Sequence, residues 1–409
     1  MTGGRGQRRP RQRVARGRSV VGERFTADVG PVAHGGHCVA RVVVDPAAEP
    51  PGTRVVFVRH ALPGETVVLE ITEGTEGDRF WRGDAVEVVA ASPDRVPAPC
   101  PVAGPGLCGG CDFQHVALPR QRALKADVVR EQLVRLGRLD ASDPLVAGLE
   151  VEAVPGDDDG LRWRTRVSYA ETPDGRRGMR RHRSRDVVPV EDCLIARTDA
   201  RQVSPGEDAL PGSPSAGLVL EEVEAAGLGH AFAVAPDGFW QVHPGAPRVL
   251  VETVLELLAP QPGEAVLDLY AGVGLFARFL ADAVGPTARI VAVEGDRAAA
   301  RFARDNLAGL ERAKVEAGPV DRVLRTSYDE PFDLVVLDPP REGARRGVVE
   351  QVVDRAPRAV AYVACDPAAL GRDVAIFAEH GYRLERLRAF DLFPMTSHVE
   401  VVAKLVKSR

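Results

Sequence analysis

The sequence predicts a multidomain α/β protein, with a small β-barrel near the N-terminus and an α/β layered domain at the C-terminus. Residues 19–95 alternate β-branched and polar side chains between turn signals, which is typical of short antiparallel strands. From residue 236 onward, apolar strand-like runs alternate with runs of helical periodicity, which indicates a layered domain with a mostly parallel sheet. We therefore expect four parts: a basic arm at 1–18, a barrel at 19–95, a mixed α and β region at 96–235 and the layered domain at 236–409.

Composition limits the classes to which the protein can belong. The chain has 409 residues, enough for two or three domains. Its net charge of −5 argues against a uniformly basic nucleic-acid binder, so any nucleic-acid footprint must be a local patch. No apolar run approaches the ~18 residues that cross a membrane, and the basic N-terminus lacks the apolar segment of a secretory signal. We therefore expect a cytoplasmic protein with reduced thiols and no membrane partner.

The first two parts of the chain contain a basic arm and a row of strand signals. Residues 1–18 carry seven Arg and no acidic residue, so we expect a disordered arm that either solubilises the protein or binds phosphate. Between residues 19 and 95, strand-like runs flank the turn LPGE at 62–65, which predicts a small antiparallel barrel. A barrel of this kind need not bind nucleic acid.

The central region combines one helix with a dense run of arginine. Residues 117–137 have apolar side chains at helical spacing, and residues 161–170 and 186–194 are strand-like. Nine Arg fall between positions 162 and 185, opposed only by Glu171 and Asp174. A run of Arg is usually a solvated face. This one is dense and interleaved with Trp163, Tyr169 and His182, which favours a surface for an RNA backbone.

A ligand-binding turn is predicted near the start of the C-terminal domain. Residues 265–281 are typical of a buried strand, a Gly turn and an amphipathic helix, and Gly272 and Gly274 let the backbone approach a ligand at the helix N-terminus. The next strand ends in Glu294, where an acid usually binds ribose hydroxyls. Binding sites for NAD and for S-adenosylmethionine both have a Gly turn of this kind and an acidic residue at the end of the next strand. The third Gly of the dinucleotide fingerprint is missing, which favours the methyl donor.

Three short strings in the last quarter of the chain offer the groups needed to methylate C5 of a pyrimidine. LDPPREG at 337–343 supplies a carboxylate, ACDP at 364–367 a thiol and TSHVE at 396–400 a further carboxylate. C5 of uracil is a poor nucleophile, so an enzyme first adds a thiolate at C6. C5 then attacks an electrophilic methyl group, and a base removes the C5 proton so that the thiol can leave. Cys365 is the candidate thiol and Glu400 the candidate base.

Simpler structural interpretations exist for each of these residues. A lone Cys at a strand end is normally a small core residue. Glu400 could be a capping or salt-bridging carboxylate, and Asp338 could cap the turn at two prolines. His398 is better explained as a neutral structural histidine than as a catalytic one. For Cys365, the occurrence of all three strings together favours the catalytic interpretation.

With these motifs, the chain resembles the S-adenosylmethionine-dependent RNA 5-methyluridine methyltransferases, specifically the branch with an N-terminal TRAM domain and an iron–sulfur cluster. The resemblance implies an OB-like TRAM barrel, a central iron–sulfur region and a C-terminal Rossmann-like class I methyltransferase domain. It implies methyl-donor contacts at Gln241, Tyr270, Glu294 and Asp338, the nucleophile at Cys365 and the base at Glu400. The motifs are FWQVHPGA (239–246), DLYAGVG (268–274), VEGD (293–296), DPPREG (338–343), ACDPAAL (364–370) and FPMTSHVE (393–400).

Four of the six cysteines suggest a metal site: Cys100, Cys108, Cys111 and Cys193. A disulfide does not suit a reduced cytoplasm, and a four-thiolate zinc site usually has two close pairs, whereas this chain has one. Three nearby cysteines and a remote one fit iron–sulfur ligation better, and the family resemblance implies a [4Fe-4S] cluster on these residues. Seven residues separate Cys100 from Cys108, where the family has five, so Cys100 departs from the family pattern.

Other functions explain the sequence less well. RNA 5-methylcytidine methyltransferases have a Cys beside their DPP-like motif, and this chain has none there. Exocyclic-amine methyltransferases place an aromatic residue after DPP, where this chain has Arg341. A redox-responsive RNA-binding protein with an inactive methyltransferase domain would not need an intact set of site residues. The resemblance implies ribosomal RNA or tRNA as substrate, with 23S ribosomal RNA favoured, and we expect a monomer.

Overall fold

The computed structural model describes residues 17–48, 50–203 and 217–408. The described chain forms two compact units, one ending at Arg95 and the other beginning at Val96, with residues 34–36 grouped with the second. Most of the arm predicted at 1–18 lies outside the described residues. Its last residue, Arg18, pairs with Glu23 at 2.6 Å and with Glu76 at 3.0 Å.

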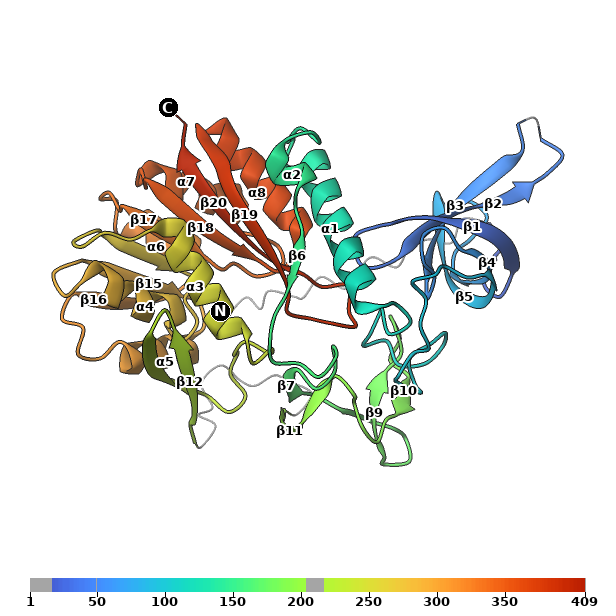
Figure 1. The fold of residues 1–409 in the computed structure, drawn as a ribbon, viewed down its shortest axis with the longest axis horizontal. Helices are drawn as coiled ribbons and strands as arrows, with labels where there is room; N and C mark the ends of the chain where they lie inside the picture. The colour runs from blue at the N-terminus through green and yellow to red at the C-terminus, as the bar shows by residue number, and fades with distance from the viewer. Residues whose placement is uncertain (1–16, 49, 204–216, 409) are drawn as a thin grey trace, which may run out of the picture. The chain divides into compact units, whose positions relative to one another are not determined.

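The first unit is a closed five-stranded barrel in the order β1-β2-β3-β5-β4 (Figure 1). The predicted barrel is confirmed, but its pairing is not wholly antiparallel, because β3 and β5 run parallel. A closed ring with an odd number of strands cannot alternate direction at every step, so one parallel pair is required. The strands are β1 (Arg24–Val32), β2 (Cys38–Asp45), β3 (Gly52–Arg59), β4 (Thr66–Glu73) and β5 (Phe80–Ala90).

Glu65 anchors the predicted LPGE turn between β3 and β4. Its fully buried carboxylate accepts hydrogen bonds from Leu62 N at 2.8 Å and Ser92 N at 3.1 Å, and pairs with Arg95 at 2.6 Å. Burial opposes ionisation, but the Arg95 guanidinium and the two amides outweigh it, so the pKa of Glu65 lies below its usual range. The ionised side chain of Glu65, with its hydrogen bonds and its ion pair, therefore stabilises the turn.

The central segment contains one long helix and several short strands. The predicted helix is confirmed as α1 (Leu118–Arg135), which begins with a proline in its first turn. The run predicted as one strand at 161–170 is divided into two short strands, and only three residues of 186–194 form a strand. The elements are α2 (Pro144–Ala147), β6 (Val151–Ala153), β7 (Arg164–Val167), β8 (Ala170–Glu171), β9 (Arg177–Arg180), β10 (Val187–Pro189), β11 (Ala196–Gln202), β12 (Val219–Ala225) and β13 (Leu228–Val234).

An eight-stranded sheet forms the core of the second unit, in the order β16-β15-β14-β17-β18-β20-β19-β6. Its first five strands are parallel, as predicted, whereas β20 runs antiparallel to both β18 and β19. The short β6, from the central segment, pairs with β19 at the edge. The C-terminal strands are β14 (Val266–Leu269), β15 (Ile290–Glu294), β16 (Ala313–Ala317), β17 (Leu334–Leu337), β18 (Ala359–Ala364), β19 (Tyr382–Asp391) and β20 (Glu400–Lys407).

Helices cover both faces of this sheet and produce two hydrophobic cores (Figure 1). Within β17, Leu334 and Val336 point into one core while Val335 and Leu337 point into the other. The first core also contains α3, α4 and the β12–β13 hairpin, and the second contains α1, α6, α7 and α8. The helices are α3 (Ala246–Leu258), α4 (Leu275–Val284), α5 (Arg297–Asn306), α6 (Val320–Thr326), α7 (Arg345–Asp354) and α8 (Pro367–Glu379).

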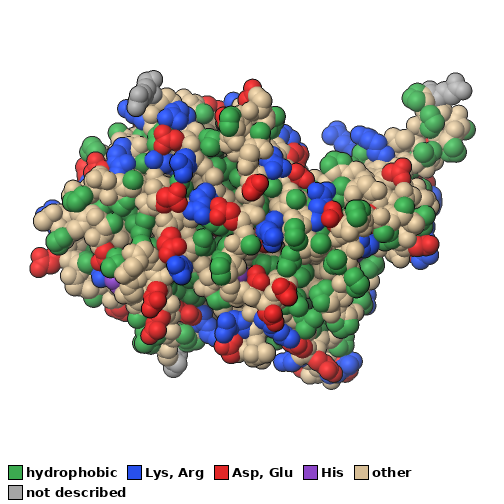
Figure 2. All heavy atoms as spheres, viewed as in Figure 1, with side chains coloured by type: hydrophobic (Ala, Val, Ile, Leu, Met, Phe, Trp, Pro, Cys, Tyr) green, Lys and Arg blue, Asp and Glu red, His purple; other side chains and the backbone are tan. Residues whose placement is uncertain are grey.

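Charged side chains of both signs are interspersed on the face of the molecule shown in Figure 2, in line with the small net charge of −5. Within the described residues, no helix has both the length and the apolar character that crossing a membrane requires.

Candidate active site

The candidate site residues gather where the parallel strands end. Tyr270 follows β14, Glu294 is the last residue of β15, Asp338 follows β17, and Cys365 follows β18. Glu400 begins β20, and because this strand runs antiparallel to β18, its first residue lies at the same edge of the sheet. Ligands of open α/β sheets bind at this edge, beyond the carboxyl ends of the parallel strands.

Cys365 and Glu400 face each other at the end of one ladder. The last pair of the β18–β20 ladder is Ala364 with Val401, and one further step in this register would set Cys365 opposite Glu400. Directly opposed residues of an antiparallel pair project from the same side, with Cβ atoms about 5 Å apart. Just beyond, Asp366 caps α8, its carboxylate accepting from Ala369 N at 2.8 Å, and Pro367 occupies the first turn. The Asp-Pro pair therefore starts α8 immediately after the thiol.

The predicted Gly turn connects β14 to α4 through left-handed backbone. Tyr270, Gly272 and Gly274 have φ values of +64°, +57° and +90°. Glu294 fixes the turn, accepting from Gly272 N at 2.8 Å, and its other oxygen accepts from Asp296 N at 2.6 Å. Left-handed backbone at Tyr270 is unfavourable for a residue with a Cβ and persists only where the surroundings hold it.

Within the part of the chain that the structure describes, Asp268, Glu294, Asp338 and Glu400 form no ion pair, and burial raises the pKa of each carboxyl group. Burial first, and then the charge of Glu294, raises the pKa of Asp338 to about 7. Burial also raises the pKa of Asp268 to about 7, with smaller contributions from Asp338 and Glu294. The pKa of Glu400 is raised well above its usual range by burial and by Asp338. A cluster of this kind favours a positively charged ligand, which would restore the ionised forms.

The Cys365 thiol shares this environment. Burial, then Glu400 and Asp338, raises the pKa of Cys365 to about 12, and Arg341 opposes the shift. These couplings agree with the ladder register in bringing Cys365, Glu400 and Asp338 together. Without a ligand, the sulfur is therefore held as a thiol at neutral pH.

Asp373 of α8 anchors the end of the DPPREG loop through hydrogen bonds. One oxygen of Asp373 accepts from Ala344 N at 2.7 Å and from the Tyr362 hydroxyl at 2.6 Å. Gly343 has a φ of +82°, and a Cβ added there would lie 2.6 Å from the same oxygen. The last Gly of the motif is thus required by backbone conformation and by space.

Arg341 and His398 link the two loops that flank the thiol. The Arg341 guanidinium, which can only donate, lies 3.3 Å from Nε2 of His398. Burial, followed by Arg341, lowers the pKa of His398 to about 4, so this ring is neutral at physiological pH. Gln241 comes from a separate segment ahead of α3, and the contacts of the described residues do not join its side chain to the carboxyl cluster. Thr165 holds the backbone there, donating through N to Val242 O at 2.8 Å.

Comparisons with known proteins match family models to the barrel and to the C-terminal domain, and full-length relatives to most of the chain. Residues 18–86 match the TRAM domain, 245–362 the methyltransferase small domain and 320–408 the family described as tRNA (Uracil-5-)-methyltransferase. An uncharacterized RNA methyltransferase of Streptomyces avermitilis is 44% identical, over 94% of this chain and 98% of its own. The 23S rRNA (uracil(1939)-C(5))-methyltransferase RlmD of Acinetobacter baylyi is 30% identical, over 88% and 91%.

The chain belongs to the TRAM-domain family of RNA uracil-C5 methyltransferases. It is an S-adenosylmethionine-dependent enzyme, and its substrate is RNA. The crystal structure of a Pyrococcus abyssi tRNA (uracil-54, C5)-methyltransferase with S-adenosyl-L-homocysteine shares the fold, with a TM-score of 0.63 at 21% identity over 90% of this chain and 99% of that one.

The methyltransferase also brings its four predicted cysteine ligands into one region. Burial raises the pKa of Cys111 to about 12, the Gln114 side chain opposes this, and Cys193, Cys108 and Cys100 raise it further. None of these thiols is in a disulfide. Over residues 17–48, 50–203 and 217–408, however, no three His, Cys, Asp or Glu side chains are arranged so as to hold a metal ion. Four thiols are the donors that an iron–sulfur cluster requires. Their side chains, however, are not arranged as the ligands of a bound cluster.

The long spacing after Cys100 is absorbed by successive turns. Ala103 N donates to Cys100 O, Leu107 N to Gly104 O, and Cys108 N to Val102 O, each within about 3.1 Å. These turns fold the seven intervening residues back on themselves. Cys100 consequently lies close enough to Cys111 for its charge to influence that thiol.

The arginine run of the enzyme has an inner and an outer part. The inner arginines Arg162, Arg164 and Arg166 are half-buried and bond within the protein, as where Arg162 pairs with Asp192 at 2.5 Å. The outer arginines, which lie on and around the β10-β9-β8 sheet, are exposed. The outer set is Arg176, Arg177, Arg180, Arg181, Arg183 and Arg185.

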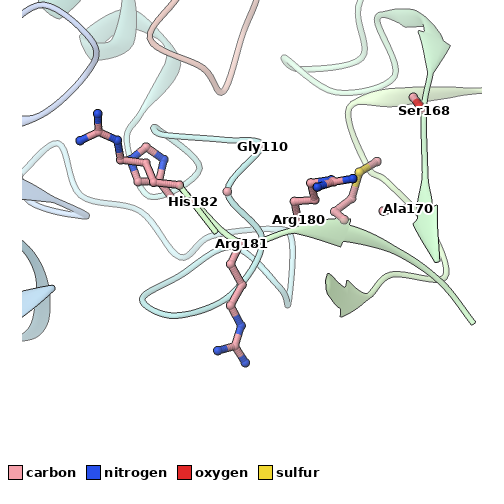
Figure 3. Close-up of a pocket in the computed structure, with 9 residues that line it drawn as sticks. Gly110, Ser168, Ala170, Arg180, Arg181 and His182 are labelled. Atoms are coloured by element: carbon pink, nitrogen blue, oxygen red, sulfur yellow. The ribbon is translucent and has the colours of Figure 1, made fainter. Parts of the chain in front are cut away.

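A hollow of about 330 Å³ lies between the outer arginines and the Cys-Gly-Gly-Cys loop (Figure 3). Gly109 N donates to Arg180 O at 3.0 Å, and a Cβ on Gly109 would lie 2.4 Å from His182 N. The loop can lie against this strand only because it carries glycine. The hollow is lined by Gly109, Gly110, Ser168, Ala170, Met179, Arg180, Arg181, His182 and Arg183.

The sequence analysis did not identify two polar residues of α1, Gln121 and Lys125, as supports of the candidate site. Gln121 and Lys125 are buried, although both are polar. One signal was available, because both fall on the apolar stripe of the predicted helix together with Val129 and Leu133. A polar side chain on a buried stripe requires a partner, and these partners lie in the loop ahead of Glu400.

Proposed function

We propose that the enzyme methylates a uridine at C5 through a covalent bond between the Cys365 sulfur and C6 of the ring, with Glu400 as the base that removes the C5 proton. The observation that carries this proposal is that Cys365 and Glu400 directly follow the last pair of the β18–β20 ladder, where the charge of Glu400 acts on the thiol. We propose that both groups face one flat ring, which would meet the sulfur at C6 and the carboxylate at the adjacent C5.

The chemistry assigns a separate step to each residue. The Cys365 thiol gives its proton to water, and the resulting thiolate adds to C6 while the electron pair of the C5–C6 double bond moves toward C5 and the C4 carbonyl. When bound, S-adenosylmethionine would supply its methyl group to C5 and leave as S-adenosylhomocysteine. Glu400 then takes the proton from methylated C5, the double bond re-forms, and the bond from C6 to Cys365 breaks.

The carboxyl cluster suits the methyl donor because the donor is a cation. Oδ1 of Asp268 is buried without a hydrogen-bond partner, and Asp338 and Glu294 have raised pKa values, mainly from burial. We propose that Glu294 binds the ribose hydroxyls and that Asp338, Tyr270 and Gln241 complete the pocket. A positive ligand held by these groups would also oppose the charges of Glu400 and Asp338, which add to burial in raising the pKa of Cys365.

We propose ribosomal RNA, and 23S ribosomal RNA in particular, as the substrate. Support comes from full-length relatives such as RlmD of Acinetobacter baylyi, whose name specifies uracil 1939 of 23S rRNA. The tRNA enzyme of Pyrococcus abyssi shares the fold at only 21% identity. Deleting the gene and mapping 5-methyluridine in all stable RNAs tests the choice. Loss from 23S ribosomal RNA is the expected result, and loss from tRNA alone would contradict it.

We propose further that Cys100, Cys108, Cys111 and Cys193 hold a [4Fe-4S] cluster with a structural role. Four uncrosslinked thiols that influence one another support this, as does the pattern of three nearby cysteines and a remote one. The cluster would fix the Cys-Gly-Gly-Cys loop, whose Gly109 bonds to the strand carrying Arg180. The adjoining hollow and the outer arginines would then form a rigid surface for the RNA backbone.

Methylation of unmodified RNA tests the proposed activity directly. Purified enzyme with labelled S-adenosylmethionine and RNA from the deletion strain should yield 5-methyluridine after digestion. Label found in 5-methylcytidine, or in no nucleoside, would contradict the proposal.

A further inference from the structure

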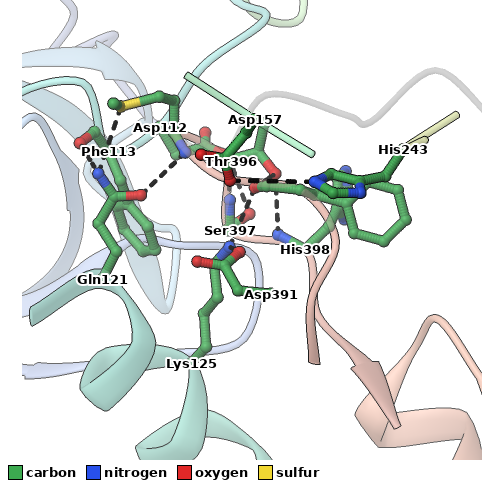
Figure 4. Close-up of polar contacts among 12 residues, drawn as sticks. Asp112, Phe113, Gln121, Lys125, Asp157, His243, Asp391, Thr396, Ser397 and His398 are labelled. Carbon is green, nitrogen blue, oxygen red and sulfur yellow. Dashed lines mark hydrogen bonds and ion pairs between the residues drawn. The ribbon is translucent and has the colours of Figure 1, made fainter. Parts of the chain in front are cut away.

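The loop that leads into Glu400 is held at alternate residues by a segment far away in sequence. This loop connects β19 to β20, and the holding residues lie between the last cysteine of the Cys-Gly-Gly-Cys loop and the middle of α1 (Figure 4). The held residues are Asp391, Phe393, Met395 and Ser397.

Lys125 holds the start of the loop through a buried ion pair. Its ammonium lies 2.5 Å from the Asp391 carboxylate and 3.0 Å from the Phe393 carbonyl oxygen. The Lys125 and Asp391 side chains are 0% and 2% exposed. Burial lowers the pKa of Lys125 from its ordinary value, and Asp391 opposes that shift. Each charge therefore depends on the other to remain buried.

Met395 is held at the turn of the loop in a left-handed conformation, with a φ of +66°. Its N–H donates to the Gln121 side-chain oxygen at 2.8 Å, and its carbonyl accepts from Asp112 N and Phe113 N, each at 3.0 Å. Gln121 is itself fixed, since its amide nitrogen donates to Val116 O at 2.8 Å. A residue with a Cβ keeps such a conformation only where surrounding bonds determine it.

Asp112 holds the last point of the loop. One oxygen of its carboxylate accepts from Ser397 N at 3.1 Å and from the Ser397 hydroxyl at 2.9 Å. Asp112 directly follows Cys111, and Ser397 lies three residues before Glu400. The contact therefore joins the end of the cysteine loop to the start of the strand that carries the proposed base.

We propose that Asp112 is a positioning residue for Glu400, and that it fixes the register in which β20 begins. Side chains alternate faces along a strand, so a slip of one residue would turn the carboxylate away from Cys365. Contacts at every second residue oppose such a slip. This inference rests on the proposed function, because it takes Glu400 as the base of the elimination step.

The test separates elimination from the earlier steps. Asp112→Ala should form the covalent adduct between Cys365 and RNA at nearly the normal rate but release product more slowly, by on the order of 10²-fold. Methylated adduct should therefore accumulate during turnover and be visible on a denaturing gel. Asp112→Asn should recover much of the release rate, since its amide oxygen still accepts from Ser397. Ser397→Ala, which keeps the backbone donor, should accumulate less adduct than Asp112→Ala.

A control variant distinguishes positioning from general loss of stability. Asp333 accepts from Ala265 N at 2.8 Å at the opposite end of the sheet, so Asp333→Ala removes a comparable bond away from the site. It should leave the ratio of adduct to product unchanged. The inference is wrong if Asp112→Ala behaves like Asp333→Ala, or if adduct formation and release fall in equal proportion. Glu400→Gln serves as the reference: if it traps no adduct, the proposed function fails and the role of Asp112 fails with it.

Discussion

Cys365 directly follows the end of β18 and Glu400 begins β20, so the two residues flank the last pair of the β18–β20 ladder, Ala364 with Val401. This relationship depends on the antiparallel direction of β20 in an otherwise parallel part of the sheet. A parallel strand would carry its first residue to the far edge. The reversal brings a carboxylate to the edge where the Gly turn and Asp338 already lie.

Binding of the methyl donor should strengthen as the pH rises through neutrality. Asp268 and Asp338 have pKa values raised to about 7, mainly by burial, so below that pH both are largely protonated in the free enzyme. A cation binds the ionised form, so binding releases a proton, and affinity is lost as the pH falls through this range. We expect an affinity gain of about tenfold between about pH 6 and 8 for each group that ionises on binding, measured by calorimetry.

Two comparisons check the origin of this effect. S-adenosylhomocysteine has no charge on its sulfur, so its affinity should depend less steeply on pH. Asp338→Asn should weaken donor binding and flatten the profile. A wild-type affinity that does not change across this range would show that these carboxyl groups do not bind the cation.

Neutralising outer arginines should weaken RNA binding in a salt-dependent way. The triple variant of Arg180, Arg181 and Arg183 to Gln removes cations that line the hollow beside the cysteine loop (Figure 3). Each lost phosphate contact should reduce the magnitude of the slope of log affinity against log salt by about 0.7–0.9, so the loss of three contacts should reduce it by about 2–3.

The matched control lies on α5, where three other arginines are exposed. Their replacement by Gln removes the same charge from a helix and should leave the slope nearly unchanged. Equal slopes for both triple variants would reassign the outer arginines to a solvated face. The control residues are Arg297, Arg301 and Arg304.

Enzyme purified without oxygen should be brown and should contain about four iron and about four acid-labile sulfide per chain. Cys111→Ser should lose this iron and weaken RNA affinity more than methyl-donor affinity. Cys100→Ser tests whether the longer loop still provides a ligand. Cys38→Ser is the control, because the Cys38 thiol donates to Ala61 O inside the barrel. Stoichiometric zinc without sulfide would contradict the proposal.

Local patterns were enough to predict most of the strands and helices of the C-terminal domain. Runs such as AVAYVA ahead of Cys365 are apolar throughout because β18 is buried on both faces. The strand β19 is not predicted by this pattern, because its sequence, YRLERLRAFD, has many charged residues in place of an apolar run. Arg388 shows how that charge is accommodated: it pairs with Glu152 of β6 at 2.8 Å and with Glu256 of α3 at 2.8 Å. Those partners are distant in sequence and cannot be predicted from one segment.

The sequence names candidate site residues one by one but does not predict their arrangement. Glu294 and Asp338 follow strands that the apolar pattern identifies, so their position at one edge follows from parallel pairing. The register that sets Glu400 against Cys365 is long-range, because it depends on pairing across the loop before β20. The ion pair between Lys125 and Asp391 is also long-range, since it joins the regions 96–235 and 236–409, which the sequence predicts as separate parts.

The most direct test of Glu400 as the base is whether RNA stays covalently bound to Cys365 in a Glu400→Gln variant. Without a base, the thiol can still attack C6 and C5 can still accept the methyl group, but the C5 proton stays and the bond to Cys365 cannot break. A denaturing gel should therefore show a protein–RNA band that carries the transferred methyl label and is absent from the Cys365→Ala, Glu400→Gln double variant. Free RNA with normal 5-methyluridine from the single variant would show that Glu400 is not the base.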